Sequence, residues 1–417
     1  MTDLDRDAGL HDTSISINRV ESALQRACDT KSKISDFKSR SIGGQMGFMS
    51  EIFAVKLVWQ PKDEKLPDSV VVKVPTGTNA QEHFKAMEPM LDEATIKAHR
   101  ETNWPEFLGR QTRIECMTMD YFRRCEEKNP KSIIRVPKLY HHEEWSPEHP
   151  EVTTWCIIED FSDVACTPNM ADGMTIEQVL SAIDNLATAH VASLSFPDGW
   201  HVKFMEGMVM EHLQDFIGTM KCITKMLIHI SPPLSDLVNR LLPHFTMEKF
   251  MGAAMSGMKC GMPGVLVHGD LWIANMLYGN KPENSDRLVT ILDWASAAPG
   301  NGAQDIARML FSSVDGELRR QETDRVLEYY HKRFHEELKV QMQDSTEKFT
   351  LSQLHDAYEA CLPCVMMFTV FGVPMWMRIP EITHSDDPKV KERRLRRMVQ
   401  RAKMLMEDYL AVHGDDQ

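Results

Sequence analysis

The feature that most constrains this chain is a strand–loop–strand segment with polar side chains at fixed positions. The apolar residues 265–267 lead into His268-Gly269-Asp270, and Asn275 follows Asp270 by five positions. A second apolar run, residues 288–292, ends in Asp293-Trp294. Carboxylate and amide oxygens are the ligands that a hard cation such as Mg²⁺ prefers. The segment therefore predicts a loop that carries chemistry.

Enzymes that transfer phosphoryl groups have the same order of groups. In them a loop aspartate accepts the proton of the attacking hydroxyl, while an asparagine and a later aspartate hold Mg²⁺ against the β- and γ-phosphates. This order predicts Asp270 as the base and Asn275 and Asp293 as Mg²⁺ ligands. We expect His268 to brace the loop rather than to react.

Composition restricts the partners of this chain. It has 417 residues and a formal net charge of −14, which argues against a nucleic-acid partner, because phosphate backbones are bound by clustered lysine and arginine. No stretch approaches the length of an apolar membrane span. The first residues contain no apolar signal region, and nine cysteines are scattered without regular spacing, so we expect a cytoplasmic protein with reduced thiols.

A glycine-rich turn precedes two predicted strands. Residues 14–40 predict an opening helix, and Gly43, Gly44 and Gly47 then precede strands over 52–59 and 69–75. Glycine allows backbone N–H groups to approach phosphate oxygens closely. Three glycines before a strand form a plain turn about as often as they form a phosphate-binding turn. The two strands that follow favour the phosphate role here.

Two lysines compete for a contact with the phosphates. Lys56 lies on the strand that leaves the glycine turn, whereas Lys73 lies on the next strand, where the kinase template has its lysine. We favour Lys73. Its expected acidic partner is Glu115, on a helical segment within residues 90–128, and Glu93 is the main rival.

The middle of the chain predicts a change from strands to helices. Strands over 136–140 and 153–158 complete a small sheet and lead to Glu159-Asp160-Phe161. We interpret these three residues as a hinge whose backbone meets the adenine edge. Helices follow from residue 175, and His190 lies among apolar neighbours, which indicates a core or supporting histidine.

Three features near the C-terminus have more than one interpretation. Asp305 could cap a helix or brace the catalytic loop, and we leave both open. Cys361 and Cys364 form a C-x-x-C pair inside an apolar helical run, which makes a redox role a minority hypothesis. Residues 389–403 are rich in basic side chains but also have an apolar face, which is typical of a packed amphipathic helix.

With these residues the chain resembles the aminoglycoside phosphotransferase and choline kinase-like superfamily. Within it the chain is most similar to the ecdysteroid-kinase-like (CHK kinase-like) proteins, in their nematode-type branch. The resemblance covers about residues 40–310 and is carried by Val267–Trp272 with Asn275, by Ile291–Trp294 and by Asp305–Ala307. It implies an α+β, two-lobed protein-kinase-like fold with a small antiparallel β-sheet N-lobe and a larger helical C-lobe.

The resemblance also implies roles and boundaries. Asp270 would be the base, Asn275 and Asp293 the Mg²⁺ ligands, and Lys73 with Glu115 the pair that holds the phosphates of ATP. Many relatives have Gln after the metal-site Asp-Trp, whereas this chain has Ala295. The expected division is an N-terminal helical extension (1–40), a nucleotide-binding N-lobe with the hinge (41–162) and a helical C-lobe with the catalytic loop (163–417).

The lead hypothesis is an ATP- and Mg²⁺-dependent kinase that phosphorylates a hydroxyl of a small molecule. Choline or ethanolamine kinase activity stays open beside a steroid-type or xenobiotic acceptor. The rivals are a catalytically silent pseudokinase-like binding protein and, third, a thiol oxidoreductase. Four aromatic residues could wall a pocket for a ring system or a quaternary ammonium group: Trp272, Trp294, Phe371 and Trp376.

Overall fold

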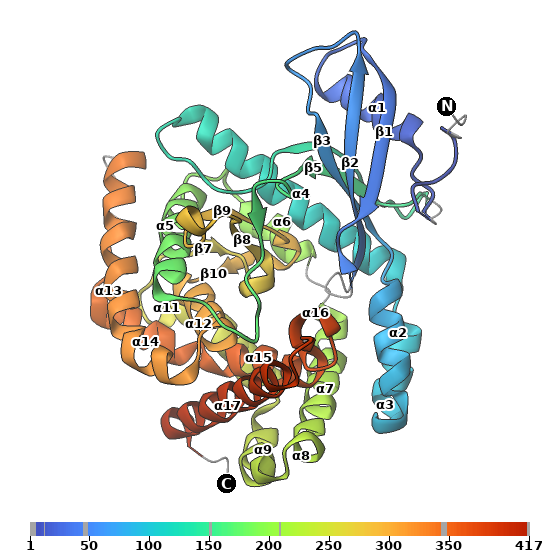
Figure 1. The fold of residues 1–417 in the computed structure, drawn as a ribbon. Coiled ribbons are helices and arrows are strands. Elements are labelled where there is room, and N and C mark those ends of the chain that lie inside the picture. Colours follow the sequence, from blue (N-terminus) through green and yellow to red (C-terminus); the bar gives the residue numbers. More distant parts are fainter. Residues whose placement is uncertain are drawn as a thin grey trace.

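The computed structural model describes residues 6–11, 13–44, 49–149, 152–207, 210–342 and 348–414. Two lobes enclose a cleft: a small lobe built on an antiparallel sheet and a large, mainly helical lobe (Figure 1). The two-lobed α+β architecture predicted from the sequence is confirmed.

The small lobe and its attached helices come first in the chain. They are α1 (Ile17–Ala27), β1 (Lys33–Ser41), β2 (Ser50–Gln60), β3 (Ser69–Pro75), α2 (Thr78–Met87), η2 (Glu88–Met90), α3 (Glu93–Glu101), α4 (Trp104–Lys128), β4 (Leu139–Glu143) and β5 (Trp155–Glu159). The sheet order is β1-β2-β3-β5-β4, and every neighbouring pair is antiparallel.

The predicted helix over residues 14–40 is correct for α1 and wrong for residues 33–40. These residues lie in β1, which pairs with β2 from Lys33 to Ser41. The hydrogen bonds of this pairing come from β2, the next strand, whose paired residues lie 12 to 27 positions further along the chain, so strand pairing decides the conformation and not local periodicity. The predicted division into residues 1–40, 41–162 and 163–417 stays a prediction. Strand β1, within residues 33–41, belongs to the five-stranded sheet.

Side-chain alternation along β3 assigns its residues to two faces of the sheet. Val70 and Val72 pack in the core that α1 closes, whereas Val71 packs with Cys116 and Met119 of α4 on the other face. Successive residues of a strand point to opposite faces, so Lys73 shares the face of Val71. The sheet therefore directs Lys73 toward α4.

The large lobe contains most of the helices. Its α-helices are α5 (Ile176–Ser193), α6 (Trp200–Gly207), α7 (Met210–Thr224), α8 (Met226–Ile230), α9 (Ser235–Leu241), α10 (Met247–Ala254), α11 (Ser256–Lys259), α12 (Gly302–Ser313), α13 (Gly316–Gln341), α14 (Leu351–Ala360), α15 (Leu362–Trp376), α16 (Pro380–Thr383) and α17 (Pro388–His413). Helix α5 begins with a capping box in which Thr175 and Gln178 satisfy each other's backbone N–H groups.

Short strands and 3₁₀ turns in the large lobe carry the predicted catalytic segment. They are β6 (Ala165–Cys166), β7 (Val265–Val267), β8 (Met276–Gly279), β9 (Leu288–Ile291), β10 (Ala298–Gly300), η3 (Pro232–Leu234), η4 (Leu242–His244), η5 (Ile273–Asn275), η6 (Pro282–Asn284) and η7 (Trp294–Ser296). Strand β7 pairs with β10, and β8 pairs with β6 and β9.

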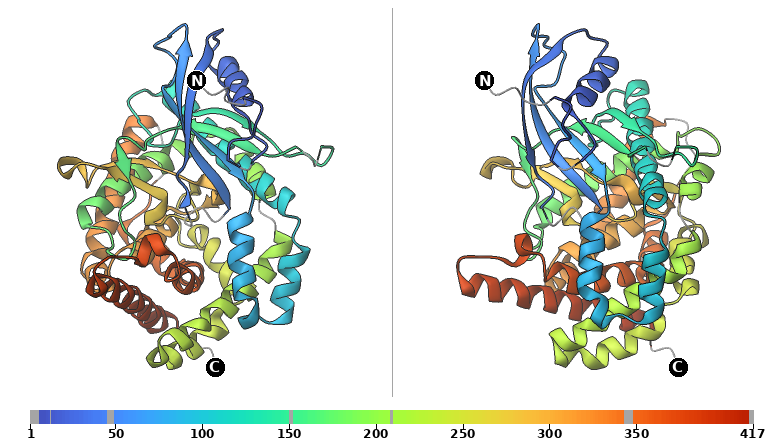
Figure 2. Two further views of the ribbon diagram at one scale, coloured as in Figure 1. Left: turned by 45° about the vertical axis from the view of Figure 1, so that its right-hand side comes forward. Right: turned by 90° about the vertical axis from the view of Figure 1, so that its right-hand side faces the viewer.

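Helices α2 and α3 run from the small lobe down beside helices of the large lobe (Figures 1 and 2). Met87, the last residue of α2, packs with Ile223 of α7 and Met226 of α8. This apolar contact ties the segment between β3 and α4 to the large lobe, so α2 and α3 cover one side of the cleft.

The length and hydropathy of the helices can be compared with those of a membrane span. Among the residues that the structure describes, no single helix combines the length and hydropathy of a membrane span. Helices α14 and α15 reach those criteria only when taken together, and they are bent by 48° relative to each other.

Candidate active site

A single cleft of about 1090 Å³ brings the predicted site residues together. Its walls include Lys73 and Glu115 from the small lobe and Asp270, Asn275 and Asp293 from the large lobe. These residues come from segments far apart in the sequence. The gathering of all five in one cavity is the basis for treating it as the candidate active site.

The loop after β7 depends on a glycine and on a buried carboxylate. Gly269 has a φ of +79°, and a Cβ there would lie 2.3 Å from the carbonyl oxygen of Ser296, so the position requires glycine. Asp305 accepts hydrogen bonds from the backbone N–H of His268 (2.7 Å) and of Gly269 (3.0 Å). The interpretation of Asp305 as a brace is thus right, whereas the N-cap interpretation is wrong, because Asn301 caps α12.

Two further buried residues hold Asp305 from behind. His190 Nε2 lies 3.3 Å from Asp305 Oδ2, and His190 Nδ1 lies 2.8 Å from the hydroxyl of Tyr330. Burial raises the pKa of Tyr330, so its hydroxyl stays protonated and can donate to His190 Nδ1. A Cβ at Gly302 would lie 2.0 Å from that hydroxyl. The supporting role of His190 agrees with its sequence interpretation; Tyr330 was not foreseen.

His268 lies inside the loop, away from solvent. Its side chain is buried, its Nε2 lies 2.8 Å from the carbonyl oxygen of Leu292, and its Nδ1 accepts from the backbone N–H of Asp270 at 3.3 Å. The ring also packs against Trp294, with centroids 4.7 Å apart. Both ring nitrogens therefore have structural partners, as expected for a bracing residue.

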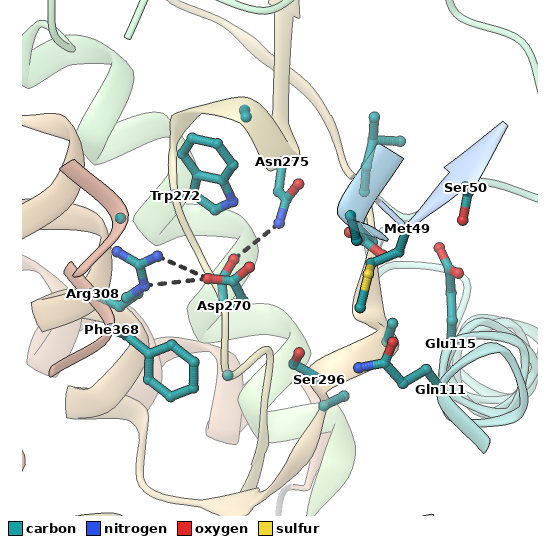
Figure 3. A pocket seen from close by; sticks show the side chains of 18 of the residues that line it. Met49, Ser50, Gln111, Glu115, Asp270, Trp272, Asn275, Ser296, Arg308 and Phe368 are labelled. Carbon is teal, nitrogen blue, oxygen red and sulfur yellow. Dashed lines mark hydrogen bonds and ion pairs between the residues drawn. The ribbon is translucent and has the colours of Figure 1, made fainter. Parts of the chain in front are cut away.

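Asp270 lies between an arginine and an asparagine (Figure 3). Its Oδ1 accepts hydrogen bonds from Arg308 Nη2 (2.9 Å) and Nε (3.3 Å). Its backbone carbonyl accepts from Asn275 Nδ2 at 3.0 Å, which leaves the side-chain oxygen of Asn275 as an acceptor for a cation. The bond to Arg308 fixes the carboxylate of Asp270 without engaging its second oxygen.

Arg308 had no role in the sequence-based predictions, although a signal was present. It is a charged residue within the apolar run 306–310, and its side chain is 5% exposed. An arginine is almost never buried without a partner. The run therefore implied a buried acidic partner for Arg308, but it could not identify Asp270.

Lys73 bridges two carboxylates across the cleft. Its Nζ lies 2.7 Å from Glu115 Oε2 and 2.9 Å from Asp293 Oδ1. The competing residues lie elsewhere: Glu93 is exposed in the first turn of α3, and Lys56 pairs with the exposed Asp163. Of the alternatives considered, the structure thus brings together Lys73 and Glu115.

The charges of this cluster influence one another. Burial disfavours the ammonium form of Lys73, but the carboxylates of Asp293 and Glu115 outweigh that cost and raise its pKa above 10.5. Burial would raise the pKa of Asp293, yet Lys73 outweighs it and lowers that pKa. For Glu115 burial is the largest influence and raises the pKa. One ammonium group therefore shares two carboxylates, and Asp293 retains the negative charge more readily.

The glycine turn and the hinge lie along the same cleft. Gly43 and Gly44 line it, and Gly44 has a φ of +48°; Gly47 lies outside the described residues. Glu159, Asp160 and Phe161 line it as well. Asp160 Oδ1 accepts from the backbone N–H of Ser162 at 2.8 Å, and within the described ranges its buried Oδ2 has no hydrogen-bond partner.

The oxygen donors in the cleft suit a magnesium ion whose coordination is completed mainly by phosphates and water. In the part of the chain described, no group of three or more His, Cys, Asp and Glu side chains lies close enough to hold a metal. Asn275 and Asp293 line the cleft, and their side chains offer two oxygen donors. This is the usual protein contribution when phosphates and water complete the coordination of Mg²⁺.

The four predicted aromatic residues do not form an open cage. The rings of Trp272 and Trp376 stack on each other, with centroids 5.1 Å apart and an interplanar angle of 18°. Both line the cleft together with Phe371, whereas Trp294 is fully buried against His268 and Phe122. Part of the predicted aromatic wall is thus core packing.

The two cysteines of the C-x-x-C motif are in surroundings that favour the protonated thiol. Burial raises the pKa of the Cys364 thiol to about 12 and that of Cys361 well above its ordinary value. The thiolate is the reactive form of cysteine, and at neutral pH these surroundings disfavour it.

The basic segment on α17 binds acidic residues of the large lobe. Arg397 and Arg401 both bind Asp315, and Arg394 binds Asp172 at 2.8 Å. The apolar residues Met398 and Leu405 of the same helix are buried in the core. The prediction of a packed amphipathic helix is confirmed.

Comparison with known proteins gives one family model and several distant relatives. A family model described as "Uncharacterized oxidoreductase dhs-27" (DUF1679) matches residues 4–417. The Caenorhabditis elegans protein of that name is 25% identical over 323 residues, which cover 76% of this chain and 37% of the relative. Most of that relative therefore lies outside the matched region.

A second C. elegans protein, "Uncharacterized kinase-like protein D1044.1", is 22% identical over 87% of this chain and 89% of its own length. The family model over residues 4–417 and the kinase-like name of this second relative agree with the nematode-type, kinase-like branch predicted from the motifs. Among solved structures, an ethanolamine kinase of Plasmodium vivax has a TM-score of 0.41 at 11% identity and covers 87% of this chain and 81% of its own. Because this score is below 0.5, the fold assignment rests on the sheet order and lobe arrangement described above.

Proposed function

This chain belongs to the DUF1679 family, and on that premise we propose that it is an ATP- and Mg²⁺-dependent phosphotransferase acting on a hydroxyl group of a small molecule. The observation that carries the proposal is the convergence of five residues on one cleft: Lys73, Glu115, Asp270, Asn275 and Asp293. A binding protein needs no general base, whereas phosphoryl transfer needs a base, a cation for the phosphates and oxygen ligands for the metal.

In the proposal the nucleotide occupies the side of the cleft between the glycine turn and the hinge. Gly43 and Gly44 approach its phosphates with their backbone, and the hinge at Glu159, Asp160 and Phe161 meets the base. The orphaned Oδ2 of Asp160 supports this site, because a buried acceptor without a partner suits a ligand that donates a hydrogen bond there.

Lys73 Nζ lies 2.9 Å from Asp293 Oδ1, and we propose that the two side chains take separate partners when nucleotide is bound. Lys73 then donates to phosphate oxygens while Glu115 keeps its Nζ in position. Asp293 and Asn275 supply oxygen ligands to Mg²⁺. When bound, ATP would supply the phosphoryl group, and Mg²⁺ would supply positive charge that neutralises the phosphate oxygens.

Asp270 has the proposed role of general base. Its Oδ1 is fixed by Arg308, so its Oδ2 is the oxygen that would accept the proton of the substrate hydroxyl. His268, Asp305 and the His190–Tyr330 pair keep the loop in place and do not exchange protons with the substrate.

The test is a labelled-ATP screen of the purified full chain against alcohol-bearing metabolites, with Mg²⁺ and with a chelator. We expect Mg²⁺-dependent transfer of label to at least one alcohol, and loss of Mg²⁺-dependent nucleotide binding in Asp293→Ala. Thermal stabilisation by Mg²⁺-ATP with no transfer to any alcohol or to water would favour the pseudokinase-like rival. Unchanged transfer by a Cys361→Ser/Cys364→Ser variant would remove the thiol hypothesis.

A further inference from the structure

The acceptor side of the cleft has a charge arrangement that the proposed function does not explain. Arg308 lies on α12, one helical turn after Asp305, and three groups from different directions hold its guanidinium. Asp270 binds it at 2.9 Å, Thr369 of α15 accepts from its Nη1 at 3.1 Å, and the ring of Trp376 lies 5.8 Å away. Its side chain is 5% exposed, so this positive charge is fixed in place.

The guanidinium compensates the carboxylate that would otherwise attract a cationic substrate. Asp270 is the acidic group at which the proposed function has the substrate hydroxyl bind, and both hydrogen bonds from Arg308 go to its Oδ1 (Figure 3). A cation that approached Asp270 would meet an ion pair with no net charge, so the attraction of the carboxylate would be largely cancelled by Arg308. The remaining carboxylate oxygen can still accept a hydroxyl proton.

The two tryptophan rings near Asp270 already have partners. Trp272 and Trp376 stack face to face, so neither forms one side of an open cage. The guanidinium of Arg308 already lies over the ring of Trp376. On these two rings, a quaternary ammonium group would have to displace the contact of Trp376 with Arg308 or the stack of Trp272 on Trp376.

The rest of the acceptor wall is apolar. Its side chains come from α7, α10 and α15 and include Phe216, Ile223, Phe250, Phe368, Phe371 and Met375. Asp215 of α7 also lines the cleft, but it is exposed, where an ion pair contributes little. A cationic acceptor would lose its hydration on this wall without an anionic partner, whereas an uncharged alcohol would bury apolar surface.

The geometry points to Arg308 as a specificity-determining residue that selects uncharged alcohols over cationic amino alcohols as acceptors. This inference rests on the proposed phosphotransferase function. It assigns the acceptor an apolar body and a hydroxyl that reaches Asp270. It also separates the two acceptor classes that the sequence left open, because choline and ethanolamine carry a positive charge.

The experiment compares two alcohols that have the same shape and differ in charge. The probes are choline and its uncharged isostere, in which carbon replaces the quaternary nitrogen. Each is titrated by calorimetry into the full chain saturated with a non-hydrolysable ATP analogue and Mg²⁺. The wild type should bind the isostere at least about tenfold more tightly than choline. Arg308→Gln should reduce that preference to about threefold or less. Arg308→Lys keeps the positive charge beside Asp270 and should retain the preference, because the preference depends on charge compensation.

Several outcomes would overturn the inference. They are equal or tighter binding of choline by the wild type, an unchanged preference in Arg308→Gln, and no binding of either alcohol. If Arg308→Gln fails to fold, the wild type and Arg308→Lys still decide the sign of the preference. Failure of the proposed function is a separate result, because it would appear as absent binding of the ATP analogue or absent phosphoryl transfer.

Discussion

The two sides of the cleft both contain a buried cation paired with a carboxylate, yet the pairs differ in how firmly they are held. On the nucleotide side, Lys73 is shared between Glu115 and Asp293, and the side chain of Asp293 is 46% exposed. On the acceptor side, Arg308 binds Asp270 through two nitrogens and is 5% exposed. Lys73 can therefore exchange a carboxylate for a ligand, whereas Arg308 and Asp270 form a fixed pair.

The side-chain chemistry of the two cations explains this difference. The ammonium of lysine is a compact charge on a flexible stem with three equivalent donors, so it can move from a carboxylate to a phosphate. The guanidinium of arginine is planar, and its donors have fixed directions. Lysine therefore suits a site that rearranges on nucleotide binding, and arginine suits one that keeps a carboxylate in a constant orientation.

The largest expected effect comes from neutralising the carboxylate on the acceptor side. Asp270→Asn removes the proposed base but keeps the size of the side chain, so kcat should fall by about 10²–10⁴-fold. Nucleotide binding should stay close to that of the wild type, because Lys73 and Asp293 are unchanged. Turnover would be measured by ADP release and nucleotide binding by thermal shift. An Asp270→Asn enzyme with wild-type turnover would disprove the assignment.

The second prediction breaks the pair on the nucleotide side. Glu115→Gln removes one of the two carboxylates that pair with the buried Lys73, and Asp293 remains. Because the buried ammonium loses a partner, the free energy of unfolding should fall by about 3 kcal/mol. Urea denaturation measures the change. Glu93→Gln is the matched control at an exposed position and should stay within about 0.5 kcal/mol of the wild type. Equal effects of the two substitutions would contradict the assigned pairing.

The third prediction concerns the support behind the acceptor side, where α17 packs against α15. Burial would raise the pKa of Asp315, but hydrogen bonds from Arg397 and Arg401 outweigh it and lower the pKa. Stability from this group is therefore present above its unfolded pKa and is lost as the pH falls through the lower folded value.

Asp315→Asn should accordingly cost about 1 kcal/mol at neutral pH, a figure reduced for the partial exposure of this side chain. It should also flatten the fall in unfolding free energy between about pH 5 and pH 2. Urea unfolding across that range checks both effects. Asp386→Asn, at an exposed carboxylate, is the control and should leave the slope unchanged.

The smallest expected effect tests how firmly Arg308 is held. Thr369→Val removes one hydrogen bond to Nη1 while both bonds to Asp270 remain, so stability should fall by about 1 kcal/mol or less. The preference for the uncharged isostere over choline should not change. A loss of that preference in Thr369→Val would mean that α15, rather than Asp270, determines the position of the guanidinium.

Local rules in the sequence predicted much of the architecture. Alternation in β3 directs Lys73 to the face that α4 covers, and the apolar runs on either side of His268-Gly269-Asp270 form β7, β8 and β9. Helix α5, with Thr175 as its N-cap, begins at the point, residue 175, where the sequence predicted the change to helices. These features depend on neighbours within a few residues, which is why sequence periodicity revealed them. The helix predicted over 14–40 failed in its second half because β1 depends on its pairing with β2.

The sequence by itself determined which residue types are present and in what order: a loop with Asp270 and Asn275, a later Asp293 and an upstream Lys73. Only the tertiary structure decided the partners. Lys73 and Asp293 are separated by 220 positions, and Arg308 and Asp270 by 38. No local pattern specifies such a contact, because it forms only when separate hydrophobic cores bring the lobes and α12 together. The charge on the acceptor side is for this reason a property of the fold.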